Sequence, residues 1–162
     1  MNHRPAGSAN VCAVVFACLL CVAPFRSFAQ QQLNLKPLPW VPPVPEYLMP
    51  GKGQGFAGLA TFYNGVPVIF YDSVWVEKMG GLDSPGFRFV RAHEYAHHVR
   101  QHGLIRLNSP PQAWPFLGYQ EELDADCVAV DYLKKVGDID AIRAGFQIYQ
   151  QVLPPQDSGG RA

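Results

Sequence analysis

The sequence predicts an α+β fold in which a small β-hairpin or sheet region is followed by three helices. Residues 56–72 contain two segments rich in β-branched and aromatic residues. These segments flank Asn64-Gly65, a dipeptide typical of a two-residue hairpin turn. Further along the chain, apolar residues recur at helical spacing in three stretches, which begin near Ser84, Tyr119 and Asp138. Strands that precede a run of helices indicate an α+β domain.

The two strands of the hairpin are predicted at residues 59–63 and 66–71. Pro67 has no N–H group to donate to a sheet, so we expect its strand to lie at an edge or to begin there. Residues 73–79 are predicted to form a short helix, because apolar residues occupy its middle and Gly80-Gly81 follows as a stop.

The first long helix has recognisable ends in the sequence. Ser84 is suited to cap its N-terminus, and Pro85 suits the first helical position, where a missing N–H group costs nothing. Gly103 directly follows His102, and a glycine is typical of the residue that ends a helix. We therefore predict a single helix from Pro85 to His102, ended by Gly103.

Within this helix, His93, Glu94 and His97 form the pattern H-E-x-x-H. Two histidines four residues apart lie one above the other on the same face of a helix, so their imidazoles can bind one metal ion together. The glutamate after the first histidine lies near that face and can hold a water molecule. The pattern is typical of zinc metalloproteases, in which the glutamate of the pattern is the general base, so Glu94 is expected to have that role here.

A catalytic zinc ion needs a third protein ligand. A histidine six residues after His97 is excluded, because that position is Gly103. A cysteine ligand is disfavoured, because the metal-bound cysteine of peptide deformylases precedes the helix, whereas Cys127 follows it. A glutamate on the following helix remains. Glu122 suits this role and lies one turn before Asp126, so the two side chains project from the same face.

The segment Glu122-Leu123-Asp124-Ala125-Asp126 resembles the E-x-x-A-D signature that follows H-E-x-x-H in gluzincin-type zinc metallopeptidases, among them bacterial neutral zinc metallopeptidases. The resemblance covers roughly residues 56–153 and is strongest at the two motifs. It implies a zincin-like fold with one zinc ion between the two motif-bearing helices, bound by His93, His97 and Glu122. Asp126 is implied to orient a zinc-bound histidine, since such an imidazole usually donates its other N–H group to a carboxylate.

The resemblance also bears on the predicted hairpin. In zinc peptidases an edge strand near the active helix commonly pairs with an extended peptide substrate, and this role is implied for the hairpin over residues 56–72. The alternative is an ordinary hairpin that only covers the core.

Residues 1–29 are predicted to be a secretory signal peptide. Arg4 supplies a weak positive start, residues 11–22 form an apolar run, and Ser27-Phe28-Ala29 matches a cleavage site. The run is too short to span a bilayer comfortably, so we expect no transmembrane anchor in the mature chain. The protein is therefore expected to be exported, either to a periplasm or outside the cell. A lipoprotein anchored at Cys18 is the alternative.

Removal of this signal peptide takes away three of the four cysteines and leaves Cys127, so no disulfide is expected within the mature chain. Cys127 lies on an apolar helix. We expect it to pack as a small hydrophobic residue, with a reactive thiol as the alternative.

Charge excludes some classes of partner. Of the 13 basic and 13 acidic residues, Arg4 and Arg26 lie in the signal peptide, which leaves the mature chain with a net charge of −2. Because there is also no basic run, binding to nucleic acid or to an anionic membrane has no electrostatic support. The mature chain of about 130 residues is long enough for one domain with a single core.

Residues 30–55 are predicted to form a proline-rich N-terminal arm with an extended backbone. We expect the arm to lie on the catalytic domain or to space it from the envelope, and Trp40 and Tyr47 favour docking. Binding to a proline-recognition domain is the alternative. The catalytic domain is predicted over residues 56–153, and residues 154–162 are predicted to be a disordered tail.

Residues 108–118 contain three prolines and are predicted to be a loop between the two metal-bearing helices. Trp114 and Phe116 are expected to anchor this loop to the core, with a role in lining a substrate cleft as the alternative. His98 and His102 are expected to be solvated or to cap a helix, and a secondary metal site is their alternative.

Together these features predict an exported zinc metallopeptidase that hydrolyses a protein or peptide substrate, with Glu94 as general base toward a zinc-activated water molecule. The donor that stabilises the oxyanion could come from several side chains, namely Tyr119, Tyr132, His102 and Arg143. Two alternatives remain open. One is a non-catalytic zincin-like domain that binds a partner in the cell envelope, and the other is a zinc amidase that acts on a non-peptide bond.

Overall fold

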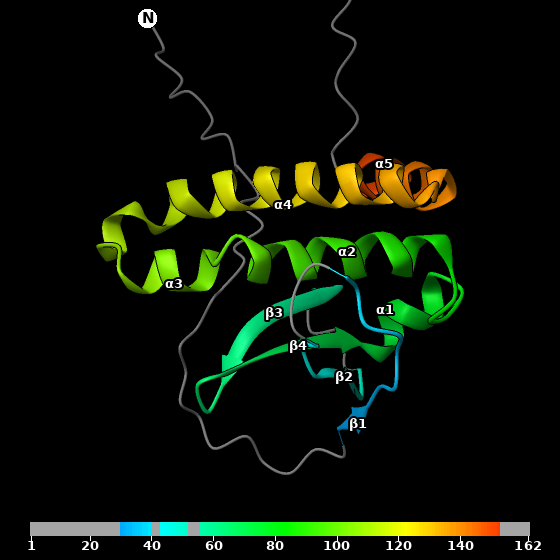
Figure 1. The fold of residues 1–162 in the computed structure, drawn as a ribbon, viewed down its shortest axis with the longest axis horizontal. Coiled ribbons are helices and arrows are strands. Elements are labelled where there is room, and N and C mark those ends of the chain that lie inside the picture. The colour runs from blue at the N-terminus through cyan, green and yellow to red at the C-terminus, as the bar shows by residue number, and fades with distance from the viewer. Residues whose placement is uncertain (1–29, 40–42, 52–55, 153–162) are drawn as a thin grey trace, which may run out of the picture.

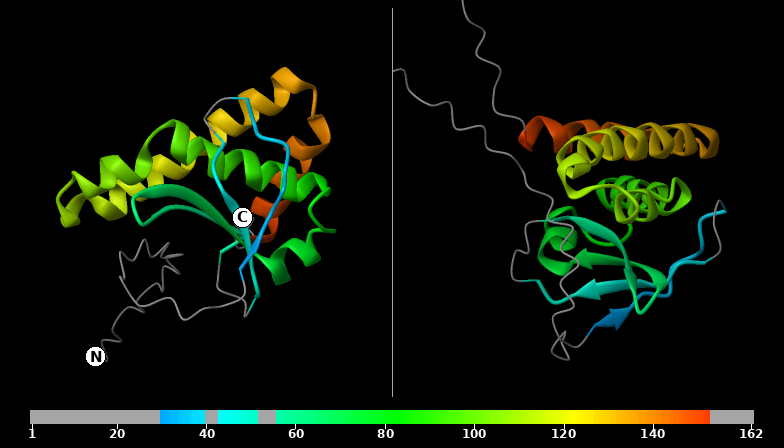
Figure 2. Two further views of the ribbon diagram at one scale, coloured as in Figure 1. Left: turned by 60° about the horizontal axis from the view of Figure 1, so that its bottom comes forward. Right: turned by 90° about the vertical axis from the view of Figure 1, so that its left-hand side faces the viewer.

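The computed structural model describes residues 30–39, 43–51 and 56–152. Helices and a small sheet are stacked in layers (Figure 1), which confirms the predicted α+β class. Helix α2 (Pro85–Val99) lies between the sheet on one side and helices α4 (Trp114–Val136) and α5 (Ile139–Val152) on the other. Figure 2 shows the same stacking from the side. The predicted signal peptide and the predicted tail lie outside the described residues.

The sheet has four strands in the order β1-β2-β4-β3. Strands β3 (Gly58–Tyr63) and β4 (Val66–Asp72) form the predicted hairpin, and they pair antiparallel. Asn64 and Gly65 at its turn have φ angles of 50° and 78°. Positive φ at both central residues is what a two-residue turn needs to match the twist of the strands, so the hairpin prediction is confirmed.

The structure decides between the two expectations for the strand that contains Pro67. Strand β4, which contains Pro67, lies inside the sheet rather than at its edge. Proline is tolerated there because the parallel pairing with strand β2 (Glu46–Met49) begins only at Ile69, two residues later. Pro67 is thus near the start of its strand, and the edge position belongs to β3.

The N-terminal segment joins the sheet directly. Strand β1 (Gln31–Gln32) pairs antiparallel with β2, and β2 pairs parallel with β4. Three leucines that follow β1 are partly buried against the hydrophobic core, namely Leu33, Leu35 and Leu38. The described parts of the expected arm therefore lie on the domain and supply two of its four strands.

The predicted starts of helices α1 and α2 are confirmed by the residues that cap them. Asp72 accepts hydrogen bonds from the backbone N–H groups of Val74 and Trp75 at the start of α1 (Ser73–Lys78). Ser84 accepts one from Phe87 at the start of α2, with Pro85 at the first helical position. These bonds satisfy N–H groups that have no partner inside the helix.

The first long helix is shorter than predicted. Helix α2 ends at Val99, and Gln101 has a φ of 59°, which breaks the helix before α3 (His102–Leu107) begins. Gly103 therefore lies inside α3 and does not end α2. Glycine or asparagine usually occupies a left-handed position, whereas glutamine seldom does. The sequence therefore gives no signal for a helix end at Gln101.

Helix α4 begins earlier than predicted, at Trp114, because Pro115 occupies its first turn, where proline is well tolerated. A short 3₁₀ turn (Pro111–Ala113) leads into it. The indole N–H group of Trp114 donates to the carbonyls of Arg106 and Ser109, as expected of a residue that anchors the connection. The other aromatic residue expected to anchor it, Phe116, is exposed.

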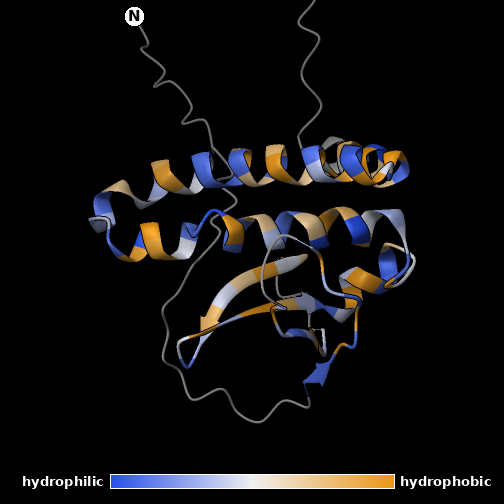
Figure 3. Ribbon diagram, viewed as in Figure 1, coloured by the Kyte–Doolittle hydropathy of each residue, from blue (hydrophilic) through white to orange (hydrophobic). Residues whose placement is uncertain are grey.

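The core lies between the sheet and α2 and continues to α4 and α5. Its largest fully buried apolar side chains are Tyr71, Phe87, Tyr95 and Ile69. Both long helices carry alternating bands of apolar and polar residues (Figure 3), as helices with one buried face do. Within the described residues, no helix has the length and apolarity needed to cross a membrane.

Candidate metal centre

The two predicted motifs meet between helices α2 and α4, which run antiparallel to each other (Figure 1). Helix α2 carries His93, Glu94 and His97, and α4 carries Glu122 and Asp126. Both histidines and the general-base candidate are largely buried, whereas Glu122 keeps part of its side chain exposed.

The side chains of His93, His97 and Glu122 converge on one point. The Nε2 atoms of the two histidines are 3.0 Å apart. The Glu122 carboxylate lies 3.1 Å from His93 Nε2 and 3.6 Å from His97 Nε2. All three ligand atoms lie within 4.8 Å of one another, so this group could hold a metal ion. Two imidazole nitrogens and one carboxylate oxygen aimed at a common point are a donor set that suits a divalent transition metal.

The outer nitrogen of His93 has the partner that was expected. Its Nδ1 atom lies 2.8 Å from Oδ1 of Asp126, one turn after Glu122 on α4. With Nε2 directed at the ligand group, Nδ1 carries the proton and donates it to this carboxylate. Such a bond fixes the orientation and the tautomer of a metal-binding imidazole.

The two histidines have opposite pKa shifts. Burial lowers the pKa of His93, but its hydrogen bonds to Asp126 and Glu122 outweigh that effect and raise the pKa to about 10. Burial lowers the pKa of His97 to about 2, and the charge of His93 beside it acts in the same direction. Two charged rings this close together repel each other, so the pair holds only one proton beyond those of the two neutral rings, and therefore a single positive charge. A metal ion has to displace that proton, because it binds neutral imidazoles.

Glu94 is buried on the side of α2 that faces strand β3. Its Oε2 atom accepts a hydrogen bond of 2.8 Å from the backbone N–H group of Ala60. Burial raises the pKa of Glu94 to about 7, although the positive charge of His93 and the N–H group of Ala60 act in the opposite direction. A carboxyl group with a pKa near neutrality can both take up and release a proton at physiological pH.

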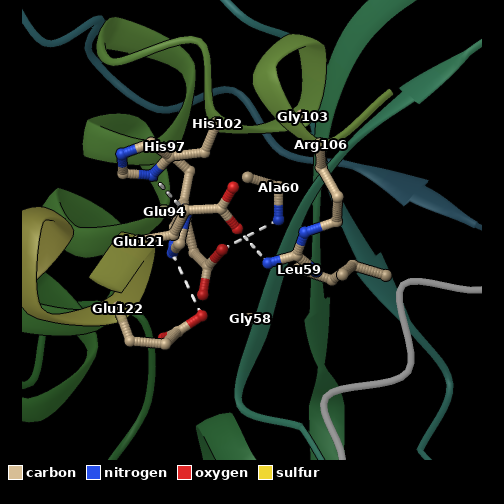
Figure 4. Close-up of a pocket in the computed structure, with 10 residues that line it drawn as sticks. All are labelled: Gly58, Leu59, Ala60, Glu94, His97, His102, Gly103, Arg106, Glu121 and Glu122. Carbon is tan, nitrogen blue, oxygen red and sulfur yellow. Dashed lines mark hydrogen bonds and ion pairs between the residues drawn. The ribbon is translucent and has the colours of Figure 1, made fainter. Parts of the chain in front are cut away.

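These side chains line a cavity of about 50 Å³, which has room for one or two water molecules (Figure 4). Strand β3 forms one wall with Gly58, Leu59 and Ala60. Helices α2, α3 and α4 supply the other lining residues, which are Glu94, His97, His102, Gly103, Arg106, Glu121 and Glu122.

Arg106 is a pocket residue that the sequence did not single out. It pairs with the buried carboxylate of Glu121, and its Nε atom has no hydrogen-bond partner in the described part of the chain. Its position depends on the direction of helix α3, which no local sequence signal predicts. Of the four residues considered as oxyanion donors, His102 lines the pocket, whereas Tyr119 and Arg143 are exposed and Tyr132 packs against the core.

Three expectations for single residues need correction or a choice between alternatives. His102 is buried and not solvated, with contacts to His97 and Asp124. His98 bonds to the carbonyl of Val68, so the two histidines have different partners and form no second metal site. Cys127 is exposed and does not pack as a buried hydrophobic residue, because it lies on the outer face of α4.

No protein-family model matches the chain, and neither a curated protein nor a solved structure matches it at a significant level. The functional interpretation therefore depends on the arrangement of these side chains and on the two sequence motifs.

Proposed function

We propose that the protein is an exported zinc-dependent metallopeptidase with a zincin-like site. The observation that carries this proposal is the convergence of His93, His97 and Glu122, with Glu94 lining the same pocket as His97 and Glu122. A metal-binding group next to a separate buried carboxylate is the combination that metal-assisted hydrolysis requires. Export rests on the signal-like pattern of residues 1–29.

Zinc is the metal that fits this donor set best. Catalytic zinc sites use three protein ligands, and two histidines with one glutamate are a known combination. His93 and His97 hold the metal from α2, Glu122 holds it from α4, and Asp126 orients His93. Bound zinc lowers the pKa of a water molecule and polarises a substrate carbonyl.

Glu94 is assigned to the proton transfer, and Arg106 to the stabilisation of negative charge. The hydrogen bond from Ala60 holds one oxygen of Glu94, and the other oxygen takes a proton from the attacking water and passes it to the leaving amine. Arg106 is the only arginine or lysine among the described pocket residues, and its Nε–H group lacks a partner. We assign it to stabilising the oxyanion that develops on the substrate.

A peptide is the substrate class that suits the neighbouring strand. Strand β3 is an edge of the sheet, and it forms one wall of the pocket. An extended peptide that pairs with such an edge is held by main-chain hydrogen bonds, and its scissile bond is brought over the pocket.

The test is digestion of a diverse peptide mixture by the purified mature chain, read by mass spectrometry beside Glu94→Gln. Glutamine keeps the size and the acceptor for Ala60 but cannot take up a proton, so we expect zinc to bind both proteins and cuts to occur only with the wild type. Cuts by the Glu94→Gln variant would contradict the mechanism. A zinc-loaded wild type that cuts no peptide would instead favour an amidase or a binding domain.

A further inference from the structure

We propose that His102 and Asp124 position the metal ligand His97 through a chain of two hydrogen bonds, and so set the metal affinity of the site. This inference rests on the metal-binding part of the proposed function and not on the peptidase activity. It gives His97 a supporting group of its own, separate from the one that supports His93.

The contacts form a continuous chain of side chains. Nδ1 of His97 lies 2.9 Å from Nδ1 of His102, and Nε2 of His102 lies 3.2 Å from Oδ2 of Asp124. The two imidazole rings meet edge to face, with centroids 5.0 Å apart. His102 is 5% exposed, so water does not compete freely for its nitrogens. Asp124 is held in turn by Arg100, whose Nε atom lies 3.1 Å from the same carboxylate oxygen.

The positions of the protons follow from the direction of each ring. Nε2 of His97 faces His93 and Glu122 and has to keep its lone pair for a metal, so Nδ1 carries the proton. That proton is donated to Nδ1 of His102, which must therefore be unprotonated. The proton of His102 is then on Nε2, where it is donated to Asp124. Each N–H group has one acceptor, and a single tautomer of each ring satisfies the chain.

The two ligand histidines are thus supported in different ways by two aspartates of helix α4. Asp126 bonds directly to His93, whereas Asp124 acts on His97 through a second imidazole. The break between α2 and α3 makes this possible. Gln101 has a left-handed backbone conformation that turns the chain at the end of α2. His102, the next residue, therefore lies against His97 on α2.

A second metal site is the main alternative reading of these side chains, and the geometry argues against it. Asp124 approaches Nε2 of His102, while His97 approaches Nδ1 on the other side of the ring. Their ligand atoms therefore do not converge on one point. Within the described residues, the only group able to hold a metal ion is His93, His97 and Glu122.

The test compares zinc affinities of the mature chain and two variants at position 102, by competition with a chromophoric chelator. His102→Leu keeps most of the volume but removes the acceptor, and we expect zinc to bind about 10- to 100-fold more weakly. His102→Asn places a carbonyl oxygen near the position of Nδ1, so it should recover most of the loss. A role in packing alone predicts no such recovery.

His98→Leu is the matched control, because His98 is next to His97 but bonds to Val68 on the sheet. It should leave zinc affinity within about twofold of the wild type, as for a change outside the metal shell. The d–d spectrum of bound Co²⁺ is a second readout, and it should change in His102→Leu and return toward the wild type in His102→Asn. If His102→Leu does not fold, Asp124→Ala decides the question, since it removes the far end of the chain.

Unchanged affinity in His102→Leu or, where that variant does not fold, in Asp124→Ala would overturn the inference. A loss that His102→Asn does not relieve would overturn it as well. A wild-type chain that binds no zinc would instead overturn the metal site and the proposed function with it, so the two failures can be told apart.

Discussion

The carboxylate of Glu94 lies in a tight space between helix α2 and strand β3. One wall of that space is Gly58, where a Cβ atom would lie 2.6 Å from Cγ and 2.7 Å from Oε1 of Glu94. The strand can approach the carboxylate this closely only because residue 58 has no side chain. The same close approach brings the N–H group of Ala60 to Oε2 of Glu94.

Gly58→Ala should therefore impair catalysis without removing a functional group. The added methyl group has to displace the Glu94 side chain or the strand. Because a shift of about 1 Å in a catalytic group can cost roughly 100-fold in rate, we expect a loss of that order in peptide turnover. Zinc affinity should change little, since the three atoms nearest to the new methyl group all belong to Glu94 and none to a candidate ligand.

Thr61→Ala is a suitable control for this prediction, because it changes a side chain on the same strand and adds no atom near Glu94. Turnover measured with one peptide and equal zinc loading compares the two variants. Equal rates for both would show that the space beside Glu94 is not limiting.

At the scale of single residues, the sequence predicts those members of the site that lie within a few positions of one another on one helix. His93, Glu94 and His97 share one helix, so helical periodicity places them together. Glu122 lies on another helix, and its role follows from the exclusion of other third ligands together with the resemblance of its segment to a known signature. The buried position of His102 and the presence of Arg106 in the pocket are not predicted, because both depend on the turn at Gln101, where no glycine or proline marks a break.

At the scale of helices and strands, the predicted elements correspond to local signals with a physical cause. The hairpin has Asn64-Gly65, α1 and α2 have their caps, and α4 ends at Gly137 with a φ of 76°. Strand β2 was not predicted. Its parallel pairing with β4 joins residues more than 20 positions apart, and the proline-rich sequence around it favours an extended chain whether or not it joins a sheet.

Asp138, near which the third long helix is predicted to begin, caps α5 and also bonds to another helix. Its Oδ1 atom accepts a hydrogen bond of 3.2 Å from the backbone N–H group of Ala141. Its carboxylate also pairs with the guanidinium of Arg88 on α2, with Nε 2.6 Å from Oδ2. One side chain therefore begins α5 and ties it to the central helix.

Asp138→Asn should lower the free energy of unfolding by about 1 kcal/mol at pH 7, since it removes a partly exposed ion pair and a negative charge at the N-terminus of α5, whereas asparagine can still cap the helix. The hydrogen bond to Arg88 lowers the pKa of Asp138 below its ordinary value. Its charge therefore stabilises the fold above the pKa of the unfolded chain, near 4, and this contribution is lost as the pH falls through the folded-state value.

Urea unfolding at pH 7 and at several values below pH 4 measures this effect. The difference between Asp138→Asn and the wild type should shrink as the solution becomes more acidic, because the wild-type carboxyl group then also loses its charge. Asp140→Asn is the control, since Asp140 is exposed and, within the part of the chain that the structure describes, its one ion pair is with Arg143 at 3.4 Å. A difference that stays constant with pH would contradict a role for the charge.

At the scale of the whole molecule, α2 contributes residues both to the candidate site and to the contacts that hold the fold together. The face toward α4 and β3 carries Glu94 and the two histidines that could hold a metal ion, His93 and His97. Arg91 and Tyr95 on the same helix bond to Glu46 of strand β2, which also accepts a hydrogen bond of 2.8 Å from Tyr71. This buried carboxylate therefore joins the N-terminal segment, the centre of the sheet and the central helix.

The partners of Glu46 stay protonated over the working pH range. Burial raises the pKa of Tyr95 to about 12, and the charge of Glu46 adds to that shift. Burial likewise raises the pKa of Tyr71. The carboxylate thus accepts hydrogen bonds from two neutral phenols and from the Arg91 guanidinium, at distances of 2.7 to 3.2 Å.

Glu46→Gln should destabilise the whole fold by about 3 kcal/mol, the lower end of the range for breaking a buried ion pair. Tyr71 and Tyr95 donate to different oxygens of Glu46, and glutamine keeps only one acceptor oxygen, so one of these two hydrogen bonds is lost. The guanidinium of Arg91, whose side chain is 12% exposed, loses its carboxylate counter-ion, while its hydrogen bond to the carbonyl of Lys36 and its contact with the Tyr95 ring remain. The cost is thus mainly that of a buried charge without its counter-ion, and urea unfolding at pH 7 measures it.

The double variant Glu46→Gln, Arg91→Gln separates this charge effect from a loss of packing. If the unpaired guanidinium is the main cost, removing it as well should make the double variant less unstable than the sum of the two single changes. Glu77→Gln on the exposed face of α1 should change stability by less than about 0.5 kcal/mol. Additive single effects would mean that Glu46 acts through its separate hydrogen bonds. They would not support an ion pair that holds the N-terminal segment to the central helix.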